Sequence, residues 1–259
     1  MGGIRLERSG ATAVITIDRP EKLNALTLTM YDELGAAFAE VRDDARIGVA
    51  ILTGAGDRAF CVGADLGESI PALAEGRFDI SEWDPAHQKH SRLDKPVIGA
   101  VNGLCLGGGF EILLSTDIRV AADTAGFALP ETGVGVVPAG GTLARLVRQI
   151  PYAFAMDLML RGGRIDAETA ARYGILNRVV PAAELLETAY GIADELLSKS
   201  WTALATVKHA IRALSDLPLE EAFVLEAKLG QRAFASDDAR AGLAAFAQRR
   251  APSFPSRAS

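Results

Sequence analysis

Asn102-Gly-Leu-Cys-Leu-Gly-Gly-Gly-Phe-Glu111 is the stretch in which an apolar run gives way to three consecutive glycines. The β-branched residues 97–101 before it predict a buried strand, and the residues from Phe110 onward predict a helix. Glycine permits close backbone contacts that a Cβ forbids, and amides at a helix start have no acceptor within the helix. The loop can therefore direct N–H donors at a negative oxygen. The alternative is a tight turn that binds no ligand.

Outward from this loop, the apolar patterns alternate between strand and helix. Strands are expected within residues 4–18, at 47–53 and at 117–122. A helix is expected between the first two, where apolar side chains recur at spacings of three and four: Leu28, Tyr31, Leu34, Phe38 and Val41. Thr29 and Asp32 suit a capping box at its start. This alternation predicts an α/β fold.

Two other regions differ from that pattern. Residues 66–93 carry mixed charges, prolines and no periodicity, which predicts an irregular segment, either a substrate lid or variable surface. The C-terminal part predicts helices at 202–214 and 219–234, and a last helix that begins at Ser236 and is closed by Arg249 and Arg250.

Glu111 and Glu131 are the candidate acid and base. Each lies among apolar and glycine residues, where burial would favour the neutral carboxyl and prepare it for proton transfer. Alone, Glu111 is equally consistent with a charge that complements the helix dipole, and Pro130-Glu131 with an ordinary helix start. Together with a loop of amide donors, the pair suggests that one carboxyl removes a proton while the other supplies one.

The segment Ala59-Phe-Cys-Val-Gly-Ala-Asp-Leu66 also places a glycine before a possible helix start. It offers a second N–H donor at Ala64. The alternative is an ordinary strand-to-helix turn with Asp65 as its cap.

Composition and charge exclude several classes of protein. With 259 residues, 49% hydrophobic and 23% charged, the chain is typical of a folded domain rather than a disordered one. The net charge of −6 argues against nucleic-acid binding. Neither a signal peptide nor a membrane span is recognisable, so we expect a cytoplasmic protein with no membrane partner.

Metal and thiol sites are not expected. His87 and His90 lack a completing cysteine or carboxylate pattern, so we expect both at the surface and no bound metal. Cys61 and Cys105 have no obvious activating base, and we expect inert thiols.

Taken together, these segments resemble the enoyl-CoA hydratase/isomerase (crotonase) superfamily over nearly the whole chain. The matching pieces, in the order of the family, are Arg19–Leu26, Leu52–Gly54, Ala59–Leu66, Lys95–Gly103 with Leu106–Glu111, Phe127–Glu131, Pro138–Thr142 with Arg145-Leu146, Gly174–Val180 and Ala245–Arg250.

The resemblance implies a crotonase-like spiral of β-β-α turns over residues 1–199. It implies a C-terminal helical region, residues 200–259, that builds a homotrimer, often paired into a hexamer. It also implies an acyl-CoA thioester substrate whose carbonyl oxygen lies in an oxyanion hole formed by the amides of Ala64 and Gly108.

Both acid/base positions of hydratases are filled here, by Glu111 and Glu131, so the resemblance implies reversible hydration of a trans-2-enoyl-CoA. Glu111 would activate water and Glu131 would supply the α-proton, or these roles are exchanged. No metal or redox cofactor is implied, because coenzyme A is part of the substrate. The segments around both glutamates also resemble carnitinyl-CoA dehydratases. The alternatives are that reaction, a Δ3-Δ2 isomerase, and a non-catalytic acyl-CoA-binding or structural subunit.

Contacts to coenzyme A follow from the resemblance alone. They are Lys22, Ala25, Leu26, Asp65 and Leu66, with Phe246 and Arg249 of the C-terminal region, of which Arg249 matches a position that can reach the ligand of a neighbouring subunit. One departure concerns the loop Pro138-Ala-Gly-Gly141, which lacks a residue that the family often has before its glycine pair. This loop borders the acyl pocket in relatives, so the sequence does not predict the shape of that pocket.

Overall fold

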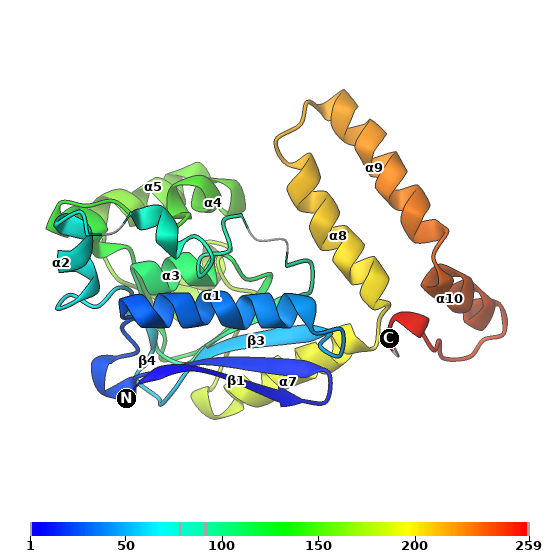
Figure 1. Cartoon of the computed structure of the whole chain (residues 1–259), viewed down its shortest axis with the longest axis horizontal. Coiled ribbons are helices and arrows are strands. Elements are labelled where there is room, and N and C mark those ends of the chain that lie inside the picture. Colours follow the sequence, from blue (N-terminus) through cyan, green and yellow to red (C-terminus); the bar gives the residue numbers. More distant parts are fainter. Residues whose placement is uncertain (1, 78, 91–92, 258–259) are drawn as a thin grey trace.

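The computed structural model describes residues 2–77, 79–90 and 93–257, and the α/β fold expected from the sequence is confirmed (Figure 1). Within these residues, a six-stranded sheet has the order β1-β2-β3-β5-β7-β10, in which β1 and β2 pair antiparallel and the other neighbours pair parallel. Its strands are β1 (Gly3–Ser9), β2 (Thr12–Asp18), β3 (Val49–Gly54), β5 (Val97–Val101), β7 (Ile118–Ala122) and β10 (Arg178–Val180).

A second sheet, of four strands among the described residues, lies alongside the first. Its strands are β4 (Ala59–Cys61), β6 (Leu104–Leu106), β8 (Gly126–Ala128) and β9 (Ile165–Asp166). The chain passes from β3 to β4, from β5 to β6 and from β7 to β8, and each pair of strands leads toward a helix. These helices are α2 (Ser69–Ala74), α3 (Gly108–Leu113) and α4 (Thr142–Gln149). This succession is the spiral of β-β-α turns that the family resemblance implies.

Helices cover both faces of the larger sheet. Successive side chains of a strand point to opposite faces, so Ala50 and Leu52 of β3 join the core under α1 (Leu28–Asp43), whereas Val49 and Ile51 pack with α7 (Leu185–Leu197). Figure 1 shows α1 and α7 on opposite sides of the strands. The chain also forms the helices α5 (Tyr152–Arg161) and α6 (Ala167–Arg172) and the 3-10 turns η1 (Pro20–Lys22), η3 (Pro130–Val134), η4 (Ala182–Glu184) and η5 (Pro255–Arg257).

The local predictions for the start of α1 and for the segment after β4 were wrong. The cap of α1 is Thr27, whose hydroxyl accepts from the amide of Met30 at 3.2 Å, and not Thr29. The described residues between 66 and 93 are also more regular than expected. They contain α2 and a 3-10 turn, η2 (Ile80–Trp83), and Trp83 is buried against the core.

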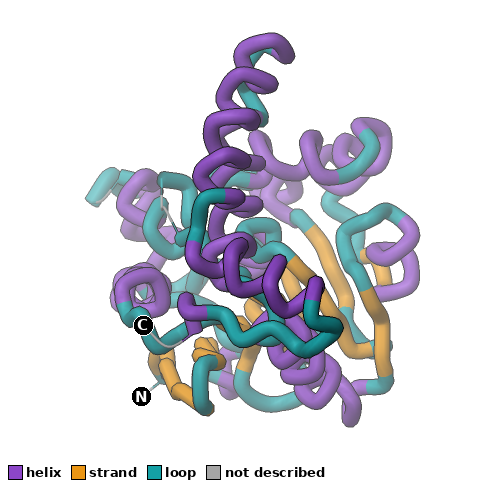
Figure 2. The backbone as a smooth tube through the Cα atoms, turned by 90° about the vertical axis from the view of Figure 1, so that its right-hand side faces the viewer, coloured by secondary structure: helices purple, strands orange, loops and turns teal. Residues whose placement is uncertain are grey.

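The C-terminal region consists of α8 (Trp201–Leu214), α9 (Leu219–Phe234) and α10 (Asp237–Ala247). The hairpin of α8 and α9 stands out from the body in both views (Figures 1 and 2). Ser236 caps α10 as expected, but the helix ends before Arg249 and Arg250. No helix among the described residues has the length and apolarity to cross a membrane. The division between residues 199 and 200 stays a prediction.

Candidate active site

Glu111 lies in the first turn of α3 and is buried as the sequence predicted, with 6% of its surface exposed. The amide of Gly140 donates to its Oε1 at 2.7 Å. Burial raises the pKa of Glu111 to about 7 and the negative charge of Glu131 adds to that effect, whereas the nearby Thr142 and the amide of Gly140 oppose it. A carboxyl with this pKa can take up or release a proton near neutral pH.

Glu131 lies in η3, directly after β8, and its carboxyl reaches the start of α3. Its Oε1 is 3.0 Å from the position that a Cβ on Gly107 would occupy. Burial raises its pKa. Its Oε2 is buried, and no described residue forms a hydrogen bond with it. The structure therefore brings the two predicted carboxyls together.

The amides of Ala64 and Gly108 lie beside these carboxyls. Leu26 donates to Gly63 O and accepts from the Asp65 amide, both at 2.8 Å, so the N–H of Ala64 between them points away from Leu26. Gly108 is the first residue of α3, where an amide has no intrahelical acceptor. A Cβ on Gly108 would lie 3.7 Å from the Ala64 nitrogen, so the two donors are neighbours.

Glycine is required here by close packing. Gly63 has φ +90°, and a Cβ on it would lie 2.8 Å from the nitrogen of Gly108. A Cβ on Gly109 would lie 2.2 Å from the carbonyl oxygen of Cys61. The glycine residues therefore let α3 approach β4 so closely that the amides of Ala64 and Gly108 lie next to each other.

An ion pair fixes the Ala64 loop. Arg19 Nη1 lies 2.6 Å from Asp65 Oδ2 and also donates to Ala25 O at 3.1 Å. The other carboxylate oxygen of Asp65 accepts from the amides of Gly67 and Glu68. These contacts lower the pKa of Asp65, chiefly through Arg19. The side chain of Asp65 is thus engaged within the protein.

Three aromatic residues that sequence reasoning did not assign to the site form a wall beside it. Tyr31 stacks on Trp83 at 4.3 Å, and its ring centroid is 5.6 Å from that of His87. The Tyr31 hydroxyl is 3.0 Å from the position of a Cβ on Gly108. His87 is completely buried, so its predicted surface position was wrong, whereas His90 is exposed as expected. The sequence signal for Tyr31 was its place in the apolar stripe of α1.

The residues predicted to contact coenzyme A fall into two groups: Lys22, Ala25, Leu26, Asp65 and Leu66 adjoin the Ala64 loop, whereas Phe246 and Arg249 belong to the C-terminal region. Ala25 and Leu26 are buried, Lys22 and Arg249 are exposed, and Leu66 and Phe246 are 79% and 83% exposed. In Figure 1, α10 lies at the opposite end of the molecule from α2 and α3. Within one chain, the structure therefore separates Phe246 and Arg249 from the carboxyls.

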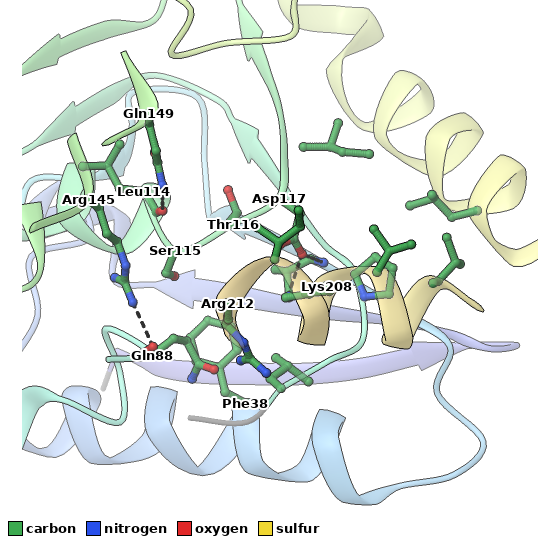
Figure 3. Close-up of a pocket in the computed structure, with 18 residues that line it drawn as sticks. Phe38, Gln88, Leu114, Ser115, Thr116, Asp117, Arg145, Gln149, Lys208 and Arg212 are labelled. Atoms are coloured by element: carbon green, nitrogen blue, oxygen red, sulfur yellow. Dashed lines mark hydrogen bonds and ion pairs between the residues drawn. The ribbon is translucent and has the colours of Figure 1, made fainter. Parts of the chain in front are cut away.

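A cavity of about 500 Å³ lies between α8 and the body, but its lining residues include neither glutamate (Figure 3). Lys208 in its wall pairs with Asp117 at 2.6 Å. Among the described residues, no cluster of histidine, cysteine and carboxylate side chains could hold a metal ion. Cys61 and Cys105 are buried, and burial raises the pKa of both thiols, that of Cys61 to about 12.

Comparison with known proteins finds relatives over nearly the whole chain. The family described as enoyl-CoA hydratase/isomerase matches residues 7–257. A carnitinyl-CoA dehydratase of Escherichia coli is 41% identical over 96% of this chain and 97% of its own, and that of Proteus mirabilis is 38% identical over 98% of both. Among solved structures, an enoyl-CoA hydratase of Bacillus anthracis has a TM-score of 0.92 at 32% identity, covering 98% of this chain and 99% of that one. One of Mycobacterium tuberculosis has a TM-score of 0.89 at 33% identity, covering 98% of both.

Proposed function

Since the chain belongs to the enoyl-CoA hydratase/isomerase family, we propose that it adds water reversibly across the double bond of a trans-2-enoyl-CoA to give a 3-hydroxyacyl-CoA. The observation that carries the proposal is the meeting of two carboxyls of raised pKa beside two adjacent amides. An acyl-CoA thioester is the substrate expected of this family.

The amides of Ala64 and Gly108 bind the thioester oxygen. When water attacks the β-carbon, electron density moves through the α-carbon onto that oxygen, and both donors stabilise the developing charge. Removing one such donor typically costs about 3 kcal/mol of transition-state stabilisation.

The two carboxyls handle the protons. In hydration, Glu111 accepts a proton from the attacking water, and Glu131 donates one to the α-carbon. In dehydration, Glu131 removes the α-proton and Glu111 returns a proton to the departing hydroxyl. All atoms are accounted for by water and proton transfer, so the proposed reaction requires neither a metal nor a redox cofactor.

A second candidate is the dehydration of carnitinyl-CoA, which the names of relatives at 38–41% identity favour. The same carboxyls and amides would carry out that elimination. The two reactions differ in the acyl group of the substrate, so comparing the turnover of the two substrates distinguishes the candidates.

We also propose that the active protein is a homotrimer or a pair of trimers. The α8–α9 hairpin exposes apolar side chains, each more than half exposed in one chain: Val207, Ile211, Leu219, Phe223 and Val224. Association would cover them, and it would allow Phe246 and Arg249 of one copy to approach coenzyme A bound to another.

The test is to mix the purified protein with crotonyl-CoA and follow the loss of the ultraviolet absorbance of the conjugated thioester. Carnitinyl-CoA and a 3-enoyl-CoA are run in parallel. We expect consumption of crotonyl-CoA, and Glu111→Gln and Glu131→Gln each lose about a hundredfold or more in turnover while still binding acyl-CoA. Preference for carnitinyl-CoA would establish the second candidate. Turnover of the 3-enoyl-CoA alone, binding without turnover, or full activity of both variants would contradict the proposal.

A further inference from the structure

The buried ring of His87 has one nitrogen without a partner. Its Nδ1 lies 2.9 Å from the carbonyl oxygen of Trp83, so Nδ1 carries the proton and donates it. Nε2 is therefore a hydrogen-bond acceptor, and no described residue donates to it. Burial also lowers the pKa of His87 to about 4, which keeps the ring neutral. A buried acceptor without a donor in a native protein indicates a partner that binds there.

The ring is held rigidly. Arg145 of α4 donates to the carbonyl oxygens of His87 and Gln88 at 2.6 and 2.8 Å, and Figure 3 shows the bond to Gln88. Tyr31, which is stacked on Trp83, lies beside the ring, with 5.6 Å between the Tyr31 and His87 centroids. Because both its backbone and Nδ1 are fixed, His87 presents Nε2 in one direction.

That direction is toward Glu111. A Cβ on Gly140 would lie 2.5 Å from His87 Nε2 and 2.6 Å from Glu111 Oε2, so both atoms border the same small volume. No hydrogen bond joins them within the described residues. Both are acceptors when the carboxyl is ionised, and a group that satisfies both must carry two hydrogens. Water is such a group, because it can donate one hydrogen to Glu111 and the other to His87. Once the first hydrogen has passed to Glu111 as a proton, the hydroxyl that remains still donates the second to His87.

We propose that His87 is a third catalytic residue, which accepts through Nε2 a hydrogen bond from the water that adds to the β-carbon, while Glu111 accepts the other hydrogen. This inference rests on the proposed function. As the oxygen bonds to the β-carbon, one proton passes to Glu111. The second stays on the new hydroxyl and remains hydrogen-bonded to His87. In dehydration, His87 holds the same hydroxyl while Glu111 returns the proton that makes it water.

The test compares two reactions of the same variants. One is hydration of crotonyl-CoA, which needs the positioned water. The other is exchange of the α-hydrogens of butyryl-CoA with D2O, which needs Glu131 and the two amides but adds no water. His87→Leu removes the acceptor, and His87→Gln keeps an acceptor oxygen near the position of Nε2. His90→Leu is the matched control, because His90 is exposed.

We expect His87→Leu to lower kcat for hydration by at least about tenfold, with KM and the exchange rate unchanged. His87→Gln should recover part of the loss, and His90→Leu should match the wild type. Hydration by His87→Leu at the wild-type rate would overturn the inference. Equal loss of hydration and exchange would also overturn it, because it would show a purely structural role. A wild-type protein that catalyses exchange but never hydrates a 2-enoyl-CoA would instead overturn the proposed function.

Discussion

The amide of Gly140 donates a hydrogen bond of 2.7 Å to Oε1 of Glu111, so the loop before α4 orients a carboxyl that α3 supplies. This loop is the one whose sequence departs from the common family pattern. Its glycine is required by the space available, because a Cβ would lie within 2.6 Å of both His87 and Glu111.

Gly140→Ala should therefore displace His87 or the carboxyl of Glu111. We expect a loss of about 1–3 kcal/mol in the free energy of unfolding from overpacking, and a loss of hydratase turnover larger than that of binding. Urea unfolding and steady-state kinetics measure the two effects. Gly163→Ala is the control, since nothing lies within 4 Å of its added Cβ. Equal behaviour of the two variants would contradict the packing argument.

The raised pKa of Glu111 makes stability depend on pH. Between its ordinary value of 4.5 and about 7, the folded protein holds a proton that the unfolded chain has released. The free energy of unfolding therefore falls as pH rises through this range, by up to about 3 kcal/mol.

Glu111→Gln cannot titrate and should be more stable than the wild type at pH 8, with the difference shrinking toward pH 5. The lowered pKa of His87 has the opposite slope between about 4 and 6.5, but both proteins share it, so it cancels in the comparison. Urea unfolding at several pH values tests this. A difference that does not change with pH would contradict the cause assigned to the pKa.

Periodic patterns and local glycine chemistry made much of the fold predictable. The strand at Val97–Val101, the helix at Leu219–Phe234 and the burial of Glu111 follow from apolar runs that the structure reproduces. His87 was not predictable in this way. Its burial depends on Trp83, Tyr31 and Arg145, which are brought to it by tertiary packing and leave no periodic signal around residue 87.

Arg19 should matter more than its position near the surface suggests. Its ion pair with Asp65 is largely buried, with side-chain exposures of 18% and 15%, and the loop that it fixes carries the Ala64 amide. Arg19→Ala leaves Asp65 without its cation, and we expect a loss of about 1–3 kcal/mol in stability together with a reduced kcat for hydration. Arg5→Ala removes an exposed pair with Asp18 and should change stability by less than about 1 kcal/mol. Similar losses of stability in both variants would contradict the role of Arg19 in fixing the loop that carries the Ala64 amide.

Asp238 ties the C-terminal region together. It is 3% exposed, and its carboxylate accepts from Ser200 at the start of α8 and from the amide of Ser256, at 2.9 Å. Asp238→Ala should remove these hydrogen bonds, which costs about 1–3 kcal/mol locally, and should speed amide hydrogen exchange in α10 more than in β3. Asp237→Ala is the control, because the carboxylate of Asp237 is exposed and forms an ion pair only with Arg240 among the described residues. Uniform exchange rates in both variants would argue against a local tie.

The exposed apolar residues of the α8–α9 hairpin give the proposed assembly a direct test. Phe223 is 53% exposed on α9, and burying it between copies would contribute about 1.5–3 kcal/mol per chain. Phe223→Lys places a charge in that contact, where it would have to be desolvated, so sedimentation should show smaller species than the three or six chains expected of the wild type. Ala36→Lys adds the same charge to an exposed position of α1 and should leave the assembly unchanged. Because Phe246 and Arg249 are proposed to act across the contact, KM for acyl-CoA should rise in Phe223→Lys alone. A wild type that sediments as a single chain would contradict the proposed assembly, and with it the role of Phe246 and Arg249 across the contact.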